Sequence, residues 1–139
     1  MYLLKYVIPM KIEIPSKIEK LTEIESLIDS ISDKVNISSD IYANILVGVT
    51  EAVKNAIIHG NLLDPTLSVG IEYEVNQKYI RFTVIDCGNG FDYYAIPDPT
   101  LPENIEKETG RGLFLMNCLA DEVVYNDKGN EVSLKFFIN

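Results

Sequence analysis

Three side chains that can take part in phosphate chemistry, Glu51, Asn55 and His59, follow one another at intervals of four residues. Apolar residues at helical spacing place them on a helix that begins at Ser38 or Ser39. Residues four apart share one face of a helix, so a carboxylate, an amide and an imidazole line a single edge. Such an edge suits a hydrated Mg²⁺ held by the Asn55 oxygen and by phosphate oxygens, which leaves Glu51 free for proton chemistry.

A second motif, Asp86-x-Gly88-x-Gly90, follows the alternating run Tyr79–Ile85, which predicts a strand. The two glycines allow a sharp backbone turn against a flat ligand. A carboxylate at the end of a strand can accept a hydrogen bond from an exocyclic amine such as that of adenine. We therefore predict a base-binding function for this motif.

A third motif, Gly110-x-Gly112-Leu113, precedes the apolar run Leu113–Leu119, which predicts a helix. The exposed N–H groups at the start of a helix bind phosphate. The three motifs, in this order, predict a nucleotide pocket.

Each of these residues also has a structural explanation. Glu51 can be a solvated helix carboxylate, whereas Asn55 is a poor helix former and needs a reason to stand in the middle of a helix. His59, the single histidine, is equally well explained as a structural group or as a partner of the helix dipole. Asp86 and its glycines fit an ordinary turn, and the later glycines fit an ordinary helix start.

Taken together, the motifs resemble those of the GHKL ATPases and, within them, the anti-sigma-factor serine/threonine kinases. Residues 51–61 are similar to the N box of that group, 86–90 to its adenine-contacting box and 110–113 to its glycine box. The resemblance covers nearly the whole chain. It implies one histidine-kinase-like ATPase domain over residues 1–139, with an ATP lid over residues 91–109.

The resemblance also implies roles for individual residues. ATP and Mg²⁺ would be the cofactors, Asn55 would contact the metal, and Glu51 would accept the proton of the incoming hydroxyl group. The residues implied in ATP binding are Asn55, His59, Asp86, Gly88, Gly90, Lys107, Gly110, Arg111, Gly112 and Leu113.

The lid is poor in cations, because five acidic residues stand there against a single lysine, Lys107, with Arg111 just beyond it. Phosphoryl-transfer sites rely on cations and metal to balance developing charge. Two functions therefore stay open. The first, which the resemblance favours, is a kinase that phosphorylates a small anti-sigma-factor antagonist and sequesters a sigma factor. The second is a nucleotide-dependent module that switches binding partners with little or no kinase activity.

A third function, the catalytic half of a sensor histidine kinase, fits less well. No phosphoacceptor-histidine hairpin is recognisable in the sequence, and His59 belongs to the N box. Related anti-sigma kinases are homodimers, so the resemblance also implies a homodimer.

Composition points to a compact intracellular domain with protein partners. The chain has 139 residues and a formal net charge of −9, which disfavours binding to a nucleic-acid backbone. The sequence suggests neither a signal peptide nor an apolar run long enough to cross a bilayer, so we expect a cytoplasmic protein with no membrane partner. Cys87 and Cys118 are expected to be free thiols.

The pattern of elements predicts an α+β fold, a two-layer α/β sandwich whose mixed, mainly antiparallel sheet carries its helices on one face. The apolar segment 2–8 is expected to pair as an edge strand or to lie in a dimer interface. A capping box at residues 16–19 is expected to open the first helix. Strands are expected at residues 11–14, 67–75, 79–85, 123–126 and 131–138, and the other helices from residues 38 or 39 and from residue 113.

Overall fold

A computed structural model describes residues 10–88 and 108–138. The segment 2–8 and most of the expected lid, residues 91–107, lie outside this range. Within it the strands are β1 (Met10–Pro15), β2 (Ser68–Val75), β3 (Tyr79–Ile85), β4 (Glu122–Tyr125) and β5 (Glu131–Phe137). The α-helices are α1 (Leu21–Val35), α2 (Ser39–Asn55) and α3 (Glu108–Leu119).

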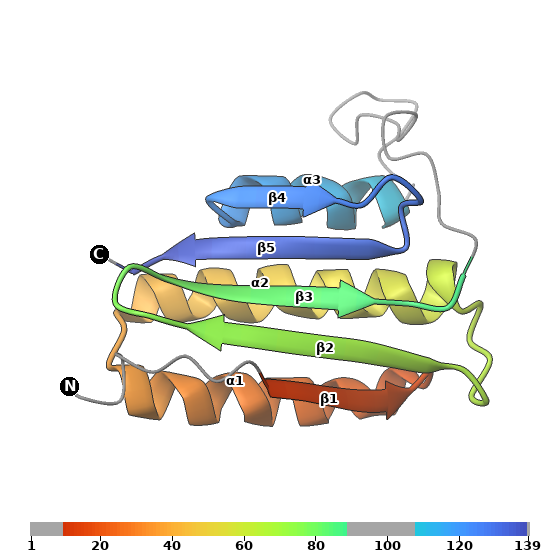
Figure 1. The fold of residues 1–139 in the computed structure, drawn as a ribbon, viewed down its shortest axis with the longest axis horizontal. Helices are drawn as coiled ribbons and strands as arrows, with labels where there is room; N and C mark the ends of the chain where they lie inside the picture. Colours follow the sequence, from red (N-terminus) through yellow and green to blue (C-terminus); the bar gives the residue numbers. More distant parts are fainter. Residues whose placement is uncertain (1–9, 89–107, 139) are drawn as a thin grey trace.

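The strands form one sheet in the order β1-β2-β3-β5-β4, and every described pair of neighbours is antiparallel. The helices lie on one face of this sheet, with α2 between α1 and α3 (Figure 1). The predicted α+β two-layer sandwich is confirmed. The described part of the sheet is wholly antiparallel rather than mixed, because each described strand pair runs in opposite directions.

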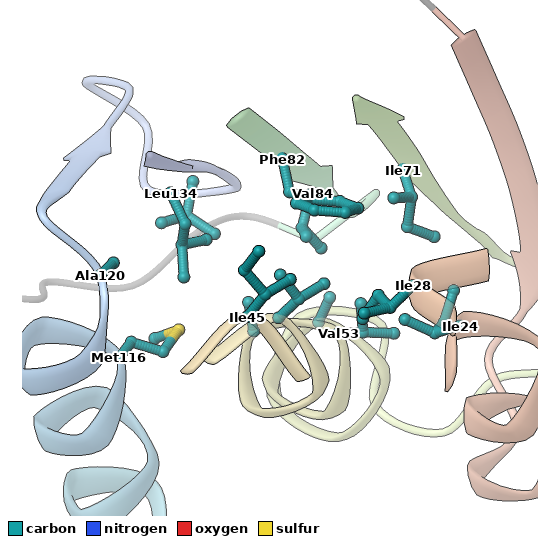
Figure 2. Packing of buried hydrophobic residues seen from close by; sticks show 14 of the residues in the cluster. Ile24, Ile28, Ile45, Val53, Ile71, Phe82, Val84, Met116, Ala120 and Leu134 are labelled. Atoms are coloured by element: carbon teal, nitrogen blue, oxygen red, sulfur yellow. The ribbon is translucent and has the colours of Figure 1, made fainter. Parts of the chain in front are cut away.

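The core lies between the sheet and its helices. Alternate residues of β3 point inward, and Phe82 at the centre of the sheet is fully buried. Burying a side chain of this size contributes about 1.5–3 kcal/mol of folding free energy. Figure 2 shows Phe82 and Val84 from β3, Ile71 from β2 and Leu134 from β5 facing residues of the helices, among them Ile45 and Val53 of α2 and Ile24 and Ile28 of α1.

The central helix α2 begins at a polar cap. The Ser38 side chain accepts a hydrogen bond from the backbone N–H of Ile41 at 3.2 Å, which satisfies one of the unpaired donors of the first turn. At its other end α2 continues into a wider, π-helical turn, Ala56–Gly60, where the Asn61 N–H donates to the Ala56 carbonyl at 2.8 Å. The sequence did not predict this widening, which is of a kind that often lies at functional sites.

The continuous helical stretch Ser39–Gly60 meets the length and hydropathy criteria for a membrane span, contrary to the expectation that no apolar run was long enough. This stretch is the central core helix, with Ile45, Val49 and Val53 buried. A core helix passes the same criteria, so this match is weak evidence for a span.

The expected start of the first helix was wrong. A 3₁₀ turn, Ile18–Lys20, precedes α1, and no side chain caps either element. Ser16 is instead buried, and its hydroxyl donates to the Leu67 carbonyl at 2.7 Å. Ile18, in the 3₁₀ turn, is exposed and does not face the core. The capping pattern failed because Ser16 is taken up by a contact between β1 and the approach to β2, which local sequence does not encode.

The start of the last helix also differs from the prediction. Helix α3 begins at Glu108, before the glycine box rather than after it. Gly110 and Arg111 therefore lie in its first turn, where backbone N–H groups still lack helical partners. The last two residues of the expected lid, 108 and 109, belong to α3.

Candidate nucleotide-binding site

A cleft lies where α2 and α3 meet the C-terminal ends of β3 and β4 and the N-terminal end of β5. It encloses about 290 Å³ of empty space, including the part that is open to solvent. The lining residues come from α2 and its π turn, β3, α3 and the β4–β5 region: Ala52, Asn55, Ala56, Val84, Asp86, Leu113, Met116, Tyr125, Gly129, Asn130, Glu131 and Val132.

One wall of the site is formed by the polar edge of α2 against α3. A Cβ atom added at Gly112 would lie 2.8 Å from Glu51 Oε2 and 3.4 Å from Asn55 Nδ2. The backbone of α3 therefore reaches this edge closely only because residue 112 is glycine. The structure thus brings together Glu51 and Asn55 from the first motif with Gly112 from the third.

The Asn55 side chain has an unusual environment. Its Nδ2 atom is buried and has no hydrogen-bond partner among the residues that the structure describes. A buried amide donor without a partner costs folding free energy of about 1–3 kcal/mol. Asn55 is therefore a candidate for ligand contact, because a ligand could accept the hydrogen bond that Nδ2 does not make within the described part of the protein.

The opposite end of the site is formed by Asp86 against the π turn. A Cβ at Gly60 would lie 2.3 Å from Asp86 Cγ, and a Cβ at Gly88 would lie 2.2 Å from the Gly60 carbonyl oxygen. Both positions therefore require glycine. The Gly88 N–H donates to Asp86 Oδ1 at 2.8 Å, which closes a short turn directly after β3.

The Asp86 carboxyl group is buried, with only 8% of the residue exposed. This burial raises the pKa of Asp86 above its ordinary value of 3.8, while the Gly88 N–H and the charge of Lys128 act in the opposite direction. A desolvated carboxylate interacts more strongly with a hydrogen-bond donor than an exposed one does. The arrangement suits recognition of a donor group on a ligand.

His59 lies apart from this cleft. It is exposed at the end of the π turn and lines a neighbouring hollow together with Gly60, Asn61, Cys87 and Gly88. Leu113 of the glycine box is buried and lines the cleft itself. The predicted contacts from Gly90 and Lys107 lie outside the described residues, and Arg111 is described only as part of the α3 backbone.

Sequence reasoning missed the contribution of the turn between β4 and β5. Gly129 and Asn130 line the cleft, although they were predicted only as parts of a turn. The asparagines at positions 126 and 130 were the available signal. Asn126 Oδ1 accepts hydrogen bonds from the backbone N–H groups of Gly129, Asn130 and Glu131 at 2.8–3.2 Å, so this turn is built around a side chain.

The described residues contain no group of three or more His, Cys, Asp or Glu side chains that could hold a metal ion. A cage made by the protein alone is therefore absent from residues 10–88 and 108–138. Both cysteines of the chain, Cys87 and Cys118, are free and exposed.

Comparison with known protein families shows to which family the chain belongs. The model of the histidine kinase-like ATPase domain family matches residues 14–136, which include all the cleft-lining residues. The chain belongs to this family. The GHKL resemblance inferred from the three motifs is thereby confirmed.

Relatives within the ATPase family narrow the assignment. The chain is 33% identical over 119 residues to the serine-protein kinase RsbW of Bacillus licheniformis, covering 81% of this chain and 74% of that one. It is 28% identical over 137 residues to the RsbW of Staphylococcus aureus strain JH9, covering 93% and 86%. This histidine kinase-like ATPase is therefore a relative of the RsbW serine-protein kinases.

A solved structure supports the fold. A crystal structure of the RsbU and RsbW domains of Rv1364c from Mycobacterium tuberculosis matches with a TM-score of 0.66 at 17% identity. The match covers 93% of this chain but only 31% of that chain. At this identity the comparison concerns the fold of the ATPase domain alone.

Proposed function

We propose that this chain is an ATP-dependent serine/threonine protein kinase in which Glu51 is the catalytic base and Asp86 binds the adenine ring. The kinase activity follows from its relationship to the RsbW serine-protein kinases. The observation that carries the residue roles is the contact between Gly112 and the Glu51–Asn55 edge, at one wall of a site whose other wall holds Asp86. Asn55 and Asp86 line the same cleft, and Glu51 lies one helical turn before Asn55 on α2.

Asp86 recognises the exocyclic amine of adenine. Its Oδ1 already accepts the Gly88 N–H, and an ionised carboxylate has capacity for further hydrogen bonds. Its burial keeps water from competing for that capacity. The exocyclic amine is a neutral donor of the kind that a buried carboxylate selects.

Asn55 is the proposed protein ligand of Mg²⁺. Its oxygen is a ligand type that Mg²⁺ accepts. Its Nδ2, unpartnered within the part of the chain that the structure describes, is a donor, so it fits a hydrogen bond to a phosphate oxygen beside the metal. The lack of an acidic cage among the described residues fits a cation whose other ligands are phosphate oxygens and water. When bound, the metal would neutralise charge on the phosphates.

Glu51 receives the proton in the transfer step. The oxygen of a substrate serine or threonine attacks the γ-phosphorus while its hydroxyl proton passes to the Glu51 carboxylate, and ADP leaves with the bond to the γ-phosphorus broken. We assign contact with phosphate oxygens to the first-turn N–H groups of α3, at residues 108–111, because the N-terminus of a helix binds anions. Glu51 stands beside this helix, as the Gly112 contact requires.

The proposed substrate is a small anti-sigma-factor antagonist, and the proposed second partner is a sigma factor, which the kinase sequesters. Phosphorylating the antagonist would prevent it from competing for the kinase and keep the sigma factor inhibited. We further propose a cytoplasmic homodimer. Sedimentation equilibrium of the full chain tests the dimer, and a monomer at micromolar concentration would refute it.

The experiment follows γ-labelled phosphate from Mg²⁺-ATP into proteins of an extract of the source organism. We expect one small protein labelled on serine or threonine, and a 10²–10⁴-fold slower transfer by Glu51→Gln with ATP affinity retained. The matched control is Asp40→Asn, which removes an exposed carboxylate from the first turn of the same helix. It should transfer phosphate at the native rate.

Two outcomes would change the proposal. Native transfer by Glu51→Gln would remove Glu51 as the base while leaving the kinase intact. Binding of ATP by the native chain without any labelled protein would instead favour the nucleotide-dependent binding module, whose partner affinity should differ between the ADP and ATP states.

A further inference from the structure

One peptide group, the one that joins Asp86 to Cys87, is held at both of its polar atoms by asparagine side chains. The Cys87 N–H donates to Asn61 Oδ1 at 2.7 Å. The Asp86 carbonyl accepts from Asn130 Nδ2 at 3.2 Å. The two asparagines come from different connections, Asn61 from the residue directly after the π turn and Asn130 from the β4–β5 turn.

Asn61 is itself fixed in a buried network. Only 2% of the residue is exposed, and its Nδ2 donates to Ser16 Oγ at 2.9 Å and to the Ser68 carbonyl at 3.1 Å. These two acceptors determine which end of the amide is the nitrogen. The oxygen is therefore directed at Cys87 by a contact with Ser16, which follows β1 and is 45 residues away, and by a contact with Ser68 at the start of β2.

Asn130 is fixed in an equivalent way on the other side. The Asp86 N–H donates to the Asn130 carbonyl at 2.9 Å, which joins the ends of β3 and β5. The Asn130 side-chain oxygen accepts from Asn126 Nδ2 at 2.7 Å, so its own nitrogen points to Asp86. The turn around Asn126 thus positions the second asparagine.

We propose that Asn61 and Asn130 clamp this peptide and thereby set the direction of the Asp86 carboxylate, which determines how strongly the site prefers adenine over a purine without the exocyclic amine. The inference rests on the proposed adenine contact of Asp86. Rotation of a peptide plane carries the neighbouring side chain with it, and a hydrogen bond weakens steeply when its angle departs from linear. Both asparagines are positioning residues, since neither needs to touch the nucleotide for this effect.

A purely structural role for the asparagines makes a different prediction. Loss of stability reduces the fraction of folded protein and weakens the apparent binding of every nucleotide by the same factor. If instead the Asp86 carboxylate loses its orientation, only the binding of a nucleotide that carries the exocyclic amine is weakened. The ratio of two affinities measured on the same protein separates these cases.

The test measures dissociation constants of ATP and of purine riboside triphosphate, which lacks only the exocyclic amine, by calorimetry on the full chain. The variants are Asn61→Ala and Asn130→Ala. The matched control is Ser38→Ala, which removes the side-chain cap of α2 and none of the hydrogen bonds of either asparagine. Asn130→Ala keeps the backbone bond to Asp86, so it tests the clamp even if Asn61→Ala fails to fold.

We expect the native chain to prefer ATP by at least about tenfold, and each asparagine variant to lose about threefold to tenfold of that preference. Ser38→Ala should keep the native ratio although its thermal stability falls. An unchanged ratio in both asparagine variants, with a discriminating native chain, would overturn the clamp and leave Asp86 as the adenine contact. A native chain that binds the two nucleotides equally would overturn the Asp86 assignment and the clamp with it.

Discussion

Gly112 of α3 lies directly against the carboxylate of Glu51 on α2, because a Cβ at position 112 would stand 2.8 Å from Glu51 Oε2. The glycine box and the N box are thus in contact, and the close approach depends on the absence of a side chain at position 112. This contact joins the part of the site proposed for phosphate to the group proposed to accept the proton. It also gives a substitution that disturbs the chemistry without removing a polar group.

Gly112→Ala is expected to slow phosphoryl transfer by one to two orders of magnitude, because the new methyl group must displace Glu51, Asn55 or the helix itself. Transfer of labelled phosphate to the isolated protein substrate measures the effect. Gly70→Ala is the control, since its Cβ would lie at ordinary contact distances, 3.4 Å from the flexible end of Lys11 and 3.8 Å from Ile85 Cβ. Native activity in Gly112→Ala would show that the Glu51 position is unimportant for transfer.

Gly60→Ala is expected to weaken ATP binding by more than about tenfold. Its Cβ would lie 2.3 Å from Asp86 Cγ, a distance at which the carboxyl group must move. If Asp86 reads the adenine amine, binding of purine riboside triphosphate should be weakened less than binding of ATP. Calorimetric titration with both nucleotides measures this, and equal losses for the two would count against a specific effect on Asp86.

The acid limit of ATP binding should lie above the pH expected for an ordinary aspartate. Burial raises the pKa of Asp86 above 3.8, and protonation removes the carboxylate that accepts the amine. Lys128→Ala removes a charge that lowers the pKa of Asp86, so it should move this limit to still higher pH. ATP affinity measured from neutral to acidic pH reports the limit, and a shift toward lower pH in Lys128→Ala would contradict the proposed electrostatics.

The same shift predicts how Asp86 affects folding stability. Because its pKa is higher in the folded state, protonation of Asp86 stabilises the fold below about pH 3.8, and this contribution is lost as the pH rises through the folded-state pKa. Near neutral pH the buried charge is a net cost. Asp86→Asn should therefore raise the melting temperature at neutral pH while abolishing the preference for ATP, and a lower melting temperature would contradict this cost.

Ser38→Ala is expected to lower the free energy of unfolding by about 1 kcal/mol, because the Ile41 N–H loses its side-chain acceptor at the start of α2. Urea unfolding followed by circular dichroism measures the change. Ser39→Ala, at the first helical residue, is the control and should be nearly neutral. Equal effects of the two substitutions would show that the cap contributes little to stability.

The local pattern of the chain predicted most of the fold. Alternation along Tyr79–Ile85 gave β3, and helical spacing around Ile45 and Val53 gave α2, since each pattern reflects which side of an element faces the core. The expected capping box was wrong because a local pattern carries no information about contacts between distant residues. Ser16 is recruited by Leu67 and Asn61, partners about 50 residues away that no local pattern reveals.

The sequence by itself determined the chemical groups of this protein: a carboxylate and an amide four residues apart, an aspartate after a strand, and glycines where backbones must pass closely. Only the tertiary structure decided how they meet. It brought Gly112 against Glu51, separated His59 from the cleft, and placed Asn61 and Asn130 on one peptide beside Asp86. The reason is physical: residue type and spacing fix the face of a helix or strand, whereas contacts between distant elements depend on how the whole core packs.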